Sequence, residues 1–262
     1  MQASSGIGGV GIGDLAGGGV AIELQRVRRV FEPSTVVIES FNLRVAAGEF
    51  LAILGPSGCG KSTLLRMIAG LLEPSGGTIS LTPAAGHGQT SFVFQDAHLL
   101  PWRTVLDNVA LPLELMGVEK EARYRKARAV LAQVGLDGVE GRYPAQLSGG
   151  MKMRVSMARA VVTGPRLLLL DEPFAALDEI TRFRLDTQLR ALWRERAMTV
   201  IFVTHSISEA AFLANRAVVL GRRGGHIKLD RNIGLPERDD ELRMNPLYGQ
   251  EMIFLLTAME EE

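Results

Sequence analysis

The chain has 262 residues, 47% of them hydrophobic, and its 29 Lys and Arg residues balance its 29 Asp and Glu residues. A chain of this size can bury a large core, and zero net charge argues against broad binding to nucleic acid or acidic lipid. The single cysteine, Cys59, excludes an intrachain disulfide. No apolar run approaches the roughly 20 residues that span a bilayer, and the N-terminus lacks the features of a secretory signal. We therefore expect a soluble protein, or one held at a membrane by a partner.

The first third of the chain predicts a tail followed by strands and one helix. Residues 1–20 are rich in glycine and predict a flexible tail, because their G-x-G-x-x-G match follows no strand. A sequence typical of β-strands begins at Ile22 and continues through VVIESFNLRV, and GEFLAILG indicates a buried strand. The run KSTLLRMIAGLL has helical spacing, and SGGTISL and TSFVFQ predict two more strands.

The rest of the chain predicts helices alternating with buried strands. The sequence from 104 to about 139 predicts helices. PRLLLLDEP predicts a continuous apolar strand, typical of a parallel sheet covered on both faces. An amphipathic helix, TRFRLDTQLRALWRER, precedes the buried strand MTVIFVTH and the short helix SEAAFLANR. RAVVLG and HIKLD predict the last strands. This order predicts an α/β fold with helices inserted in the middle.

GPSGCGKS, the segment Gly55–Ser62, fits G-x-x-x-x-G-K-[ST] in full and lies between a predicted strand and a predicted helix. Glycines let successive amides curl around phosphate oxygens, and the helix N-terminus adds partial positive charge. We expect Lys61 to reach the β- and γ-phosphates, and Ser62 to hold Mg²⁺. The expected nucleotide contacts are Gly55, Pro56, Ser57, Gly58, Cys59, Gly60, Lys61, Ser62 and Thr63. The Cys59 thiol is expected to fill space rather than to attack a substrate.

Two acids, Asp171 and Glu172, end the apolar strand LLLLDEP. Burying them is costly unless a cation or a reaction needs them, and neighbours on a strand point in opposite directions. With a phosphate loop upstream, we expect Asp171 to support Mg²⁺ through its water shell. We expect Glu172 to orient or deprotonate an attacking water.

A second glycine turn stands in LSGGMKMRVSMARA, residues 147–160. Ser148 is a natural N-cap for a helix starting near Met151, and Gly149 and Gly150 leave the first amides uncovered, which makes a second anion site. Two such sites serve one nucleotide only if they fold against each other. The other solution is a dimer, with each nucleotide between the phosphate loop of one subunit and this turn of the other.

These motifs stand in the order found in ABC-type ATPases, which the chain resembles from about Ile22 to Ile227. LSGGMKMRVSMARA resembles the signature motif of that family. The resemblance implies a P-loop NTPase core with a mainly parallel sheet, an N-terminal antiparallel β subdomain and an inserted helical subdomain at about 96–160. It implies an ATPase domain at 21–235, followed by an extension at 236–262 that we expect to be helical.

The resemblance also implies further site residues. Gln95 in VFQDAHLLPW matches the Q-loop glutamine, which contacts the metal and links the attacking water to the helical subdomain. Asp178 in AALD matches the D-loop aspartate, and His205 in FVTHSISEA matches the switch histidine, which contacts the γ-phosphate. Phe31 falls where the family carries an aromatic ring that stacks on adenine, usually a tyrosine. Met151 departs from the glutamine usual in the signature.

The segments around Gln95 and Ser148 look most like ATPases of nitrate, sulfonate and taurine importers. This implies an ATP-hydrolysing translocase subunit that uses ATP and Mg²⁺ and pairs with a second copy of itself. Its other partners would be integral permease subunits and, indirectly, a solute-binding protein, at the cytoplasmic face of the bacterial inner membrane. Trp102 and Leu99 then either face the permease or belong to the core, while the methionines at 151, 153 and 157 pack the helix.

Two other functions stay open. A non-transport ABC ATPase could act on nucleic acid or ribosomes, although the charge balance opposes this and no coiled-coil insertion or second ATPase domain is visible. A P-loop kinase of small molecules would leave the signature turn and His205 without a role. We therefore expect no nucleic-acid partner.

Overall fold

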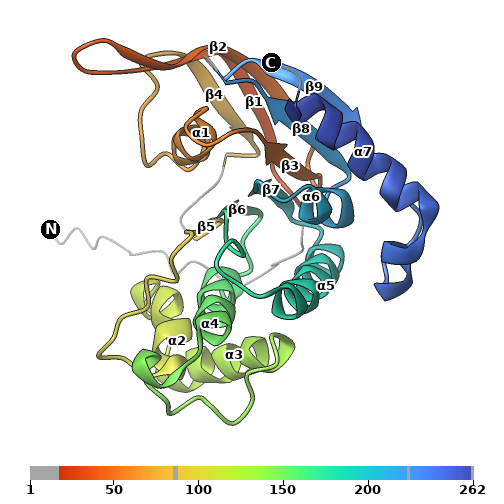
Figure 1. Ribbon diagram of the computed structural model, residues 1–262. Coiled ribbons are helices and arrows are strands. Elements are labelled where there is room, and N and C mark those ends of the chain that lie inside the picture. Colours follow the sequence, from red (N-terminus) through yellow and green to blue (C-terminus); the bar gives the residue numbers. More distant parts are fainter. Residues whose placement is uncertain (1–17, 85–87, 223–224, 261–262) are drawn as a thin grey trace, which may run out of the picture.

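The computed structural model describes residues 18–84, 88–222 and 225–260 (Figure 1). Its larger sheet has six strands in the order β5-β6-β7-β3-β8-β9. All neighbouring pairs in this sheet are parallel except β8 with β9. The strands are β3 (Phe50–Leu54), β5 (Thr90–Val93), β6 (Leu167–Asp171), β7 (Thr199–Val203), β8 (Arg216–Leu220) and β9 (Ile227–Asn232). The α/β fold predicted from the sequence is confirmed.

Helices cover both faces of this sheet, which explains its continuous apolar strands. Along β3, Leu51 and Ile53 point into the core under α1 and the smaller sheet, whereas Ala52 and Leu54 point into the core shared with the other helices. The helices on the sheet are α1 (Lys61–Ile68), α5 (Glu179–Arg196), α6 (Ile207–Leu213) and α7 (Pro246–Glu260), with a 3-10 turn η2 (Asp240–Met244). Every residue of β3, β6 and β7 is buried.

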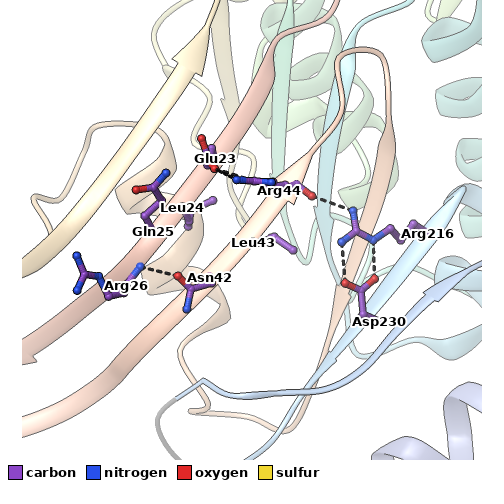
Figure 2. Close-up of a pocket in the computed structure, with 9 residues that line it drawn as sticks. All are labelled: Glu23, Leu24, Gln25, Arg26, Asn42, Leu43, Arg44, Arg216 and Asp230. Carbon is purple, nitrogen blue, oxygen red and sulfur yellow. Dashed lines mark hydrogen bonds and ion pairs between the residues drawn. The ribbon is translucent and has the colours of Figure 1, made fainter.

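The smaller sheet is antiparallel, with the order β2-β1-β4. Its strands are β1 (Ala21–Phe31), β2 (Thr35–Val45) and β4 (Gly76–Thr82). Figure 2 shows where it meets the larger sheet, around a cavity of about 540 Å³. There Arg216 donates two hydrogen bonds to Asp230, at 2.5 and 2.7 Å, and one to the carbonyl oxygen of Arg44 at 2.8 Å. These bonds tie β2 to β8 and β9, and none of the predicted site residues lines the cavity.

The inserted helices lie between β5 and β6 in the chain and gather at the end of the molecule away from the small sheet (Figure 1). They are α2 (Val105–Leu115), α3 (Lys120–Gln133), a 3-10 turn η1 (Pro144–Gln146) and α4 (Gly149–Val161). The fully buried Asn108 holds the segment before α2, because its amide nitrogen donates to the carbonyls of Leu100, Arg103 and Thr104.

The structure defines the start of α4 and the two ends of the described chain. The helix expected near Met151 begins at Gly149, because Ser148 supplies the N-cap. Residues 1–17 of the expected tail lie outside the described residues, but Val20 is fully buried and its N–H donates to Thr199 Oγ1 at 2.9 Å. The extension at 236–262 contains η2 and α7. Among the described residues, no helix is long and apolar enough to cross a membrane.

Candidate functional site

The phosphate loop, Gly55–Ser62, connects β3 to α1. Gly55, Gly58 and Gly60 have φ values of 151°, 80° and 103°, a region that favours glycine. Gly60 is also the N-cap residue of α1, and the first turn of that helix has neither a side-chain cap nor an acidic residue. The N–H groups and positive dipole end of α1 are therefore left for an anion.

Lys61 folds back over this loop and is only 5% exposed. Its Nζ donates to the carbonyl oxygens of Gly55 at 2.8 Å and Pro56 at 3.0 Å, and lies 3.9 Å from Glu172 Oε1. The ammonium group is thus held between the loop and the end of β6. Cys59 is 2% exposed, and burial raises the pKa of its thiol, so it packs as a small apolar group.

Ser62 and Asp171 meet at the edge of the loop, where Ser62 Oγ donates to Asp171 Oδ1 at 2.8 Å. Asp171 is buried, and burial raises its pKa while the Ser62 hydrogen bond opposes that change. A buried carboxylate beside a hydroxyl is an oxygen-donor set suited to Mg²⁺, which usually binds one or two carboxylates together with substrate phosphates. The residues present therefore fit the metal.

Glu172 follows directly and has φ +47°, the left-handed region that a residue with a side chain rarely adopts. Such a conformation costs on the order of 1–3 kcal/mol and persists only where the surroundings enforce it. Here its N–H donates to Val203 O at 2.9 Å, and its Oε2 lies 3.1 Å from His205 Nδ1. Glu172 therefore points its carboxylate between Lys61 and His205, the position expected of a group that acts on an attacking water.

A buried network behind His205 was not anticipated from the sequence. Thr204 donates its hydroxyl proton to the carboxylate of Glu209 and accepts the N–H of Ser206 at 2.9 Å. Burial raises the pKa of Glu209, and hydrogen bonding to Thr204 and the nearby charge of Arg182 oppose this. The acid inside the apolar helix ISEAAFL was the available signal, since a buried carboxylate needs partners.

The same network reaches the segment that carries Asp178. Arg182 Nε lies 3.4 Å from Glu209 Oε1, and Arg182 Nη2 donates to Leu177 O at 2.9 Å. One guanidinium therefore joins the turn before α5 to the loop that presents His205.

The signature turn, Ser148–Gly150, forms a separate group with the start of α5. Ser148 Oγ accepts the N–H of Met151 at 3.3 Å, and Asp178 caps α5 by accepting the N–H of Thr181 at 3.0 Å. A Cβ added at Gly150 would lie 2.9 Å from Thr181 Cγ2, whereas one added at Gly149 would meet nothing within 4 Å. Among the described residues, no hydrogen bond or ion pair joins this turn to the phosphate loop.

The remaining predicted residues lie at the surface. Gln95 is exposed just after β5, and Phe31 is exposed with the Arg29 guanidinium 4.5 Å above its ring. Trp102 is 70% exposed and so does not belong to the core, whereas Leu99 packs against it. The methionines at 151, 153 and 157 pack in the core or against it, as expected.

The chain is similar in sequence and in fold to known proteins. The ABC transporter family matches residues 38–175. The taurine import ATP-binding protein TauB of Escherichia coli K12 is 48% identical over 193 residues, 72% of this chain and 76% of that protein. The aliphatic sulfonates import ATP-binding protein SsuB 2 of Streptomyces avermitilis is 45% identical over 239 residues, 91% of this chain and 90% of that protein. A dimeric structure of a post-hydrolysis state of the ATP-binding cassette MJ0796, bound to ADP and Pi, has a TM-score of 0.72 at 30% identity, covering 82% of this chain and 100% of that chain.

Proposed function

The chain belongs to the ABC transporter family as an ATP-hydrolysing importer subunit, and we propose that it drives uptake of a small anionic solute through a separate permease. The proposed solute is of the taurine, sulfonate or nitrate type. Its curated relatives are named for taurine and aliphatic sulfonates. Its place is the cytoplasmic face of the cell membrane, where it is held by the permease. A solute-binding protein delivers the solute on the opposite side.

Hydrolysis uses the residues gathered at the ends of β3, β6 and β7. The loop amides and Lys61 bind the β- and γ-phosphates, and Phe31 stacks on the adenine. Ser62, Asp171 and Gln95 would hold Mg²⁺, which when bound would supply positive charge to the phosphates. Glu172 accepts a proton from the attacking water, and His205 holds that water and the γ-phosphate in line. The close approach of Lys61, Glu172 and His205 is the observation that carries this assignment.

The signature turn and Asp178 complete the site of a second copy. Ser148, Gly149 and Gly150 present an N-capped helix start suited to phosphate, and the open space over Gly149 leaves room for a nucleotide from outside the chain. Two copies related by a twofold axis would then enclose two ATP molecules. Binding closes this dimer and hydrolysis reopens it, which is how the chemistry moves the permease.

Ser148→Arg tests the composite site. We expect monomeric nucleotide affinity to change less than about twofold, while ATP-dependent dimerisation weakens at least about tenfold, because a long cation occupies the phosphate position. Both quantities are measured with the purified chain by equilibrium binding and sedimentation velocity. Glu119→Arg, which alters the N-cap of α3 instead, is the matched control. Equal loss in both variants would point to lost helix capping rather than to a composite site.

Three large apolar side chains of the inserted segment, before and at the end of α2, are exposed. Trp102 is 70% exposed, Leu115 79% and Met116 52%, and exposed apolar residues mark interaction sites where they gather in a patch. We propose that a short cytoplasmic helix of the permease packs on these residues and, because Trp102 follows Gln95 closely in the chain, so senses the state of the nucleotide.

Trp102→Glu tests this contact and, with it, the transport function. In cells lacking the gene, we expect wild-type protein to restore taurine or alkanesulfonate uptake and Trp102→Glu to restore less than about a tenth of it. ATP hydrolysis by the isolated variant should match wild type, and co-purification with the permease should fall. Stimulation of hydrolysis by RNA or ribosomes, with full uptake in the deletion strain, would instead favour the non-transport alternative.

A further inference from the structure

Helix α7 carries apolar side chains on several of its faces, yet the chain covers only part of them. Its sequence, PLYGQEMIFLLTAME, contains just two charged residues, Glu251 and Glu260. Tyr248, Leu255 and Ala258 are buried, and Tyr248 Oη donates to Ser208 O at 2.9 Å on α6. Figure 1 shows the helix along the outside of the molecule, beside α6, β8 and β9. Exposed apolar residues gathered on one helix face mark a contact with another molecule.

Four residues form a continuous outer stripe on the uncovered side: Gly249, Met252, Ile253 and Leu256. Their spacing of i, i+3, i+4 and i+7 places them on one face of the helix. Ile253 is 63% exposed and Leu256 44% exposed, while Met252 is half-buried at the edge. The spacing is that of a helix–helix contact.

No contact within the described residues requires a glycine at position 249 of this stripe. Glycine inside a helix is about 1 kcal/mol less favourable than alanine. Its φ is not in the left-handed region, and a Cβ added there would meet nothing within 4 Å. Close approach of a side chain from another molecule is one reason for glycine at a helix surface, and the open space over Gly249 leaves room for it.

The ends of α7 carry the wrong charges for an isolated helix. Its first turn has no acidic residue, its last turn has no basic residue, and its final residue is Glu260. Carboxylates are favourable at a helix N-terminus and unfavourable at a C-terminus. An antiparallel neighbour would correct this, because it brings the Glu260 end of one helix beside the N-terminus of the other.

We propose that α7 pairs in antiparallel fashion with α7 of a second copy of this chain, independently of nucleotide. With the twofold axis between positions 252 and 253, Gly249 faces Leu256 of the partner subunit, and Met252 faces Ile253 of the partner subunit. Glu260 then lies beside Asn245 of the partner subunit, at the start of its α7. Gly249 faces Leu256 on both sides of the axis, and Met252 and Ile253 meet at its centre, so the stripe is self-complementary.

The stripe fits a second copy better than a lipid surface. Helices that bind membranes at the interface carry Lys and Arg along their polar face, whereas α7 has neither and ends in an acid. The pairing also differs from the proposed nucleotide-dependent dimer, because it uses none of the phosphate-loop or signature residues. The two contacts can therefore be tested separately.

Sedimentation velocity of the full chain without nucleotide tests the pairing. We expect wild-type protein to dimerise and Leu256→Asp to be monomeric. Gly249→Ala should weaken the dimer at least about tenfold, because the added methyl group separates the helices. In the monomeric Leu256→Asp background the same change should raise the Tm by about 2 to 4 °C, since alanine favours the helix. A weaker dimer in the wild-type background together with a higher Tm in the monomeric background indicates that a second copy covers the stripe.

Disulfide formation gives a second readout. The only native cysteine, Cys59, is 2% exposed, so Ile253→Cys should form an intersubunit disulfide without ATP and Gln250→Cys, on the neighbouring face of α7, should not. A monomeric wild-type chain at 50 µM, a Gly249→Ala dimer as tight as wild type, or α7-dependent binding to phosphatidylglycerol vesicles would each overturn the proposal. If the α7 pairing were overturned, the double variant Leu256→Asp/Glu172→Gln should still dimerise with ATP. That dimerisation tests the nucleotide site alone.

Discussion

Replacing Glu172 with Gln is expected to lower the rate of ATP hydrolysis at least about 100-fold while leaving ATP affinity within about threefold of wild type, because general-base catalysis contributes roughly 10²–10⁴ in rate. The amide keeps the shape of the side chain and its contact with His205, but it cannot accept a proton from water. Because binding is retained without turnover, ATP should hold two copies together. The measurements are phosphate release and sedimentation in ATP and Mg²⁺.

The control for this experiment is Glu121→Gln, which removes an exposed carboxylate from α3. It should hydrolyse ATP at the wild-type rate and form no long-lived dimer that depends on ATP. If Glu172→Gln turned over ATP as fast as this control, the assignment of the base would be wrong. Slow hydrolysis without an ATP-stabilised dimer would keep the base assignment and remove the support for closure around two nucleotides.

Replacing Lys61 with Ala should weaken nucleotide binding roughly 10- to 150-fold, because a hydrogen bond to a charged group contributes about 1.5–3 kcal/mol. The ammonium group already lies within the phosphate loop on the carbonyls of Gly55 and Pro56, so the site is preorganised for anionic ligands. Equilibrium binding of a fluorescent ATP analogue by the purified variant measures the effect.

Lys126→Ala, which removes an exposed lysine from α3, is the control for non-specific electrostatic binding. Its affinity should match wild type. Thermal unfolding without nucleotide should separate a binding defect from a folding defect, since Lys61 is buried. Unchanged affinity in folded Lys61→Ala would contradict the assignment of Gly55–Ser62 as the phosphate loop.

The elements that local patterns specify were predicted well. The apolar runs LLLLDEP and MTVIFVTH became the buried strands β6 and β7, because unbroken apolar residues require cover on both faces. The loop before α1 was predictable because φ values such as that of Gly60 favour glycine, and Ser148 was predictable as a cap because its side chain satisfies a free amide. Each of these signals lies within a few residues of the feature it specifies.

The contacts that join distant segments were beyond local patterns. Nothing near Glu172 in the sequence indicates its positive φ, which depends on the hydrogen bond to Val203 from another strand. The Arg182–Glu209 pair links residues on α5 and α6, and their pairing follows from how those helices pack. The exposure of Trp102 could likewise not be predicted from the sequence, because tryptophan occurs both in cores and on docking surfaces.

For this protein, the sequence by itself determined the order of strands and helices, the phosphate loop, the carboxylate pair and the family, because each depends on neighbouring residues in a set order. The tertiary structure decided which of these residues meet. It placed Lys61, Glu172 and His205 together and left the signature turn apart from them. It also left one face of α7 uncovered. Packing decides these points, since contact between distant segments depends on the whole sheet and its layers of helices.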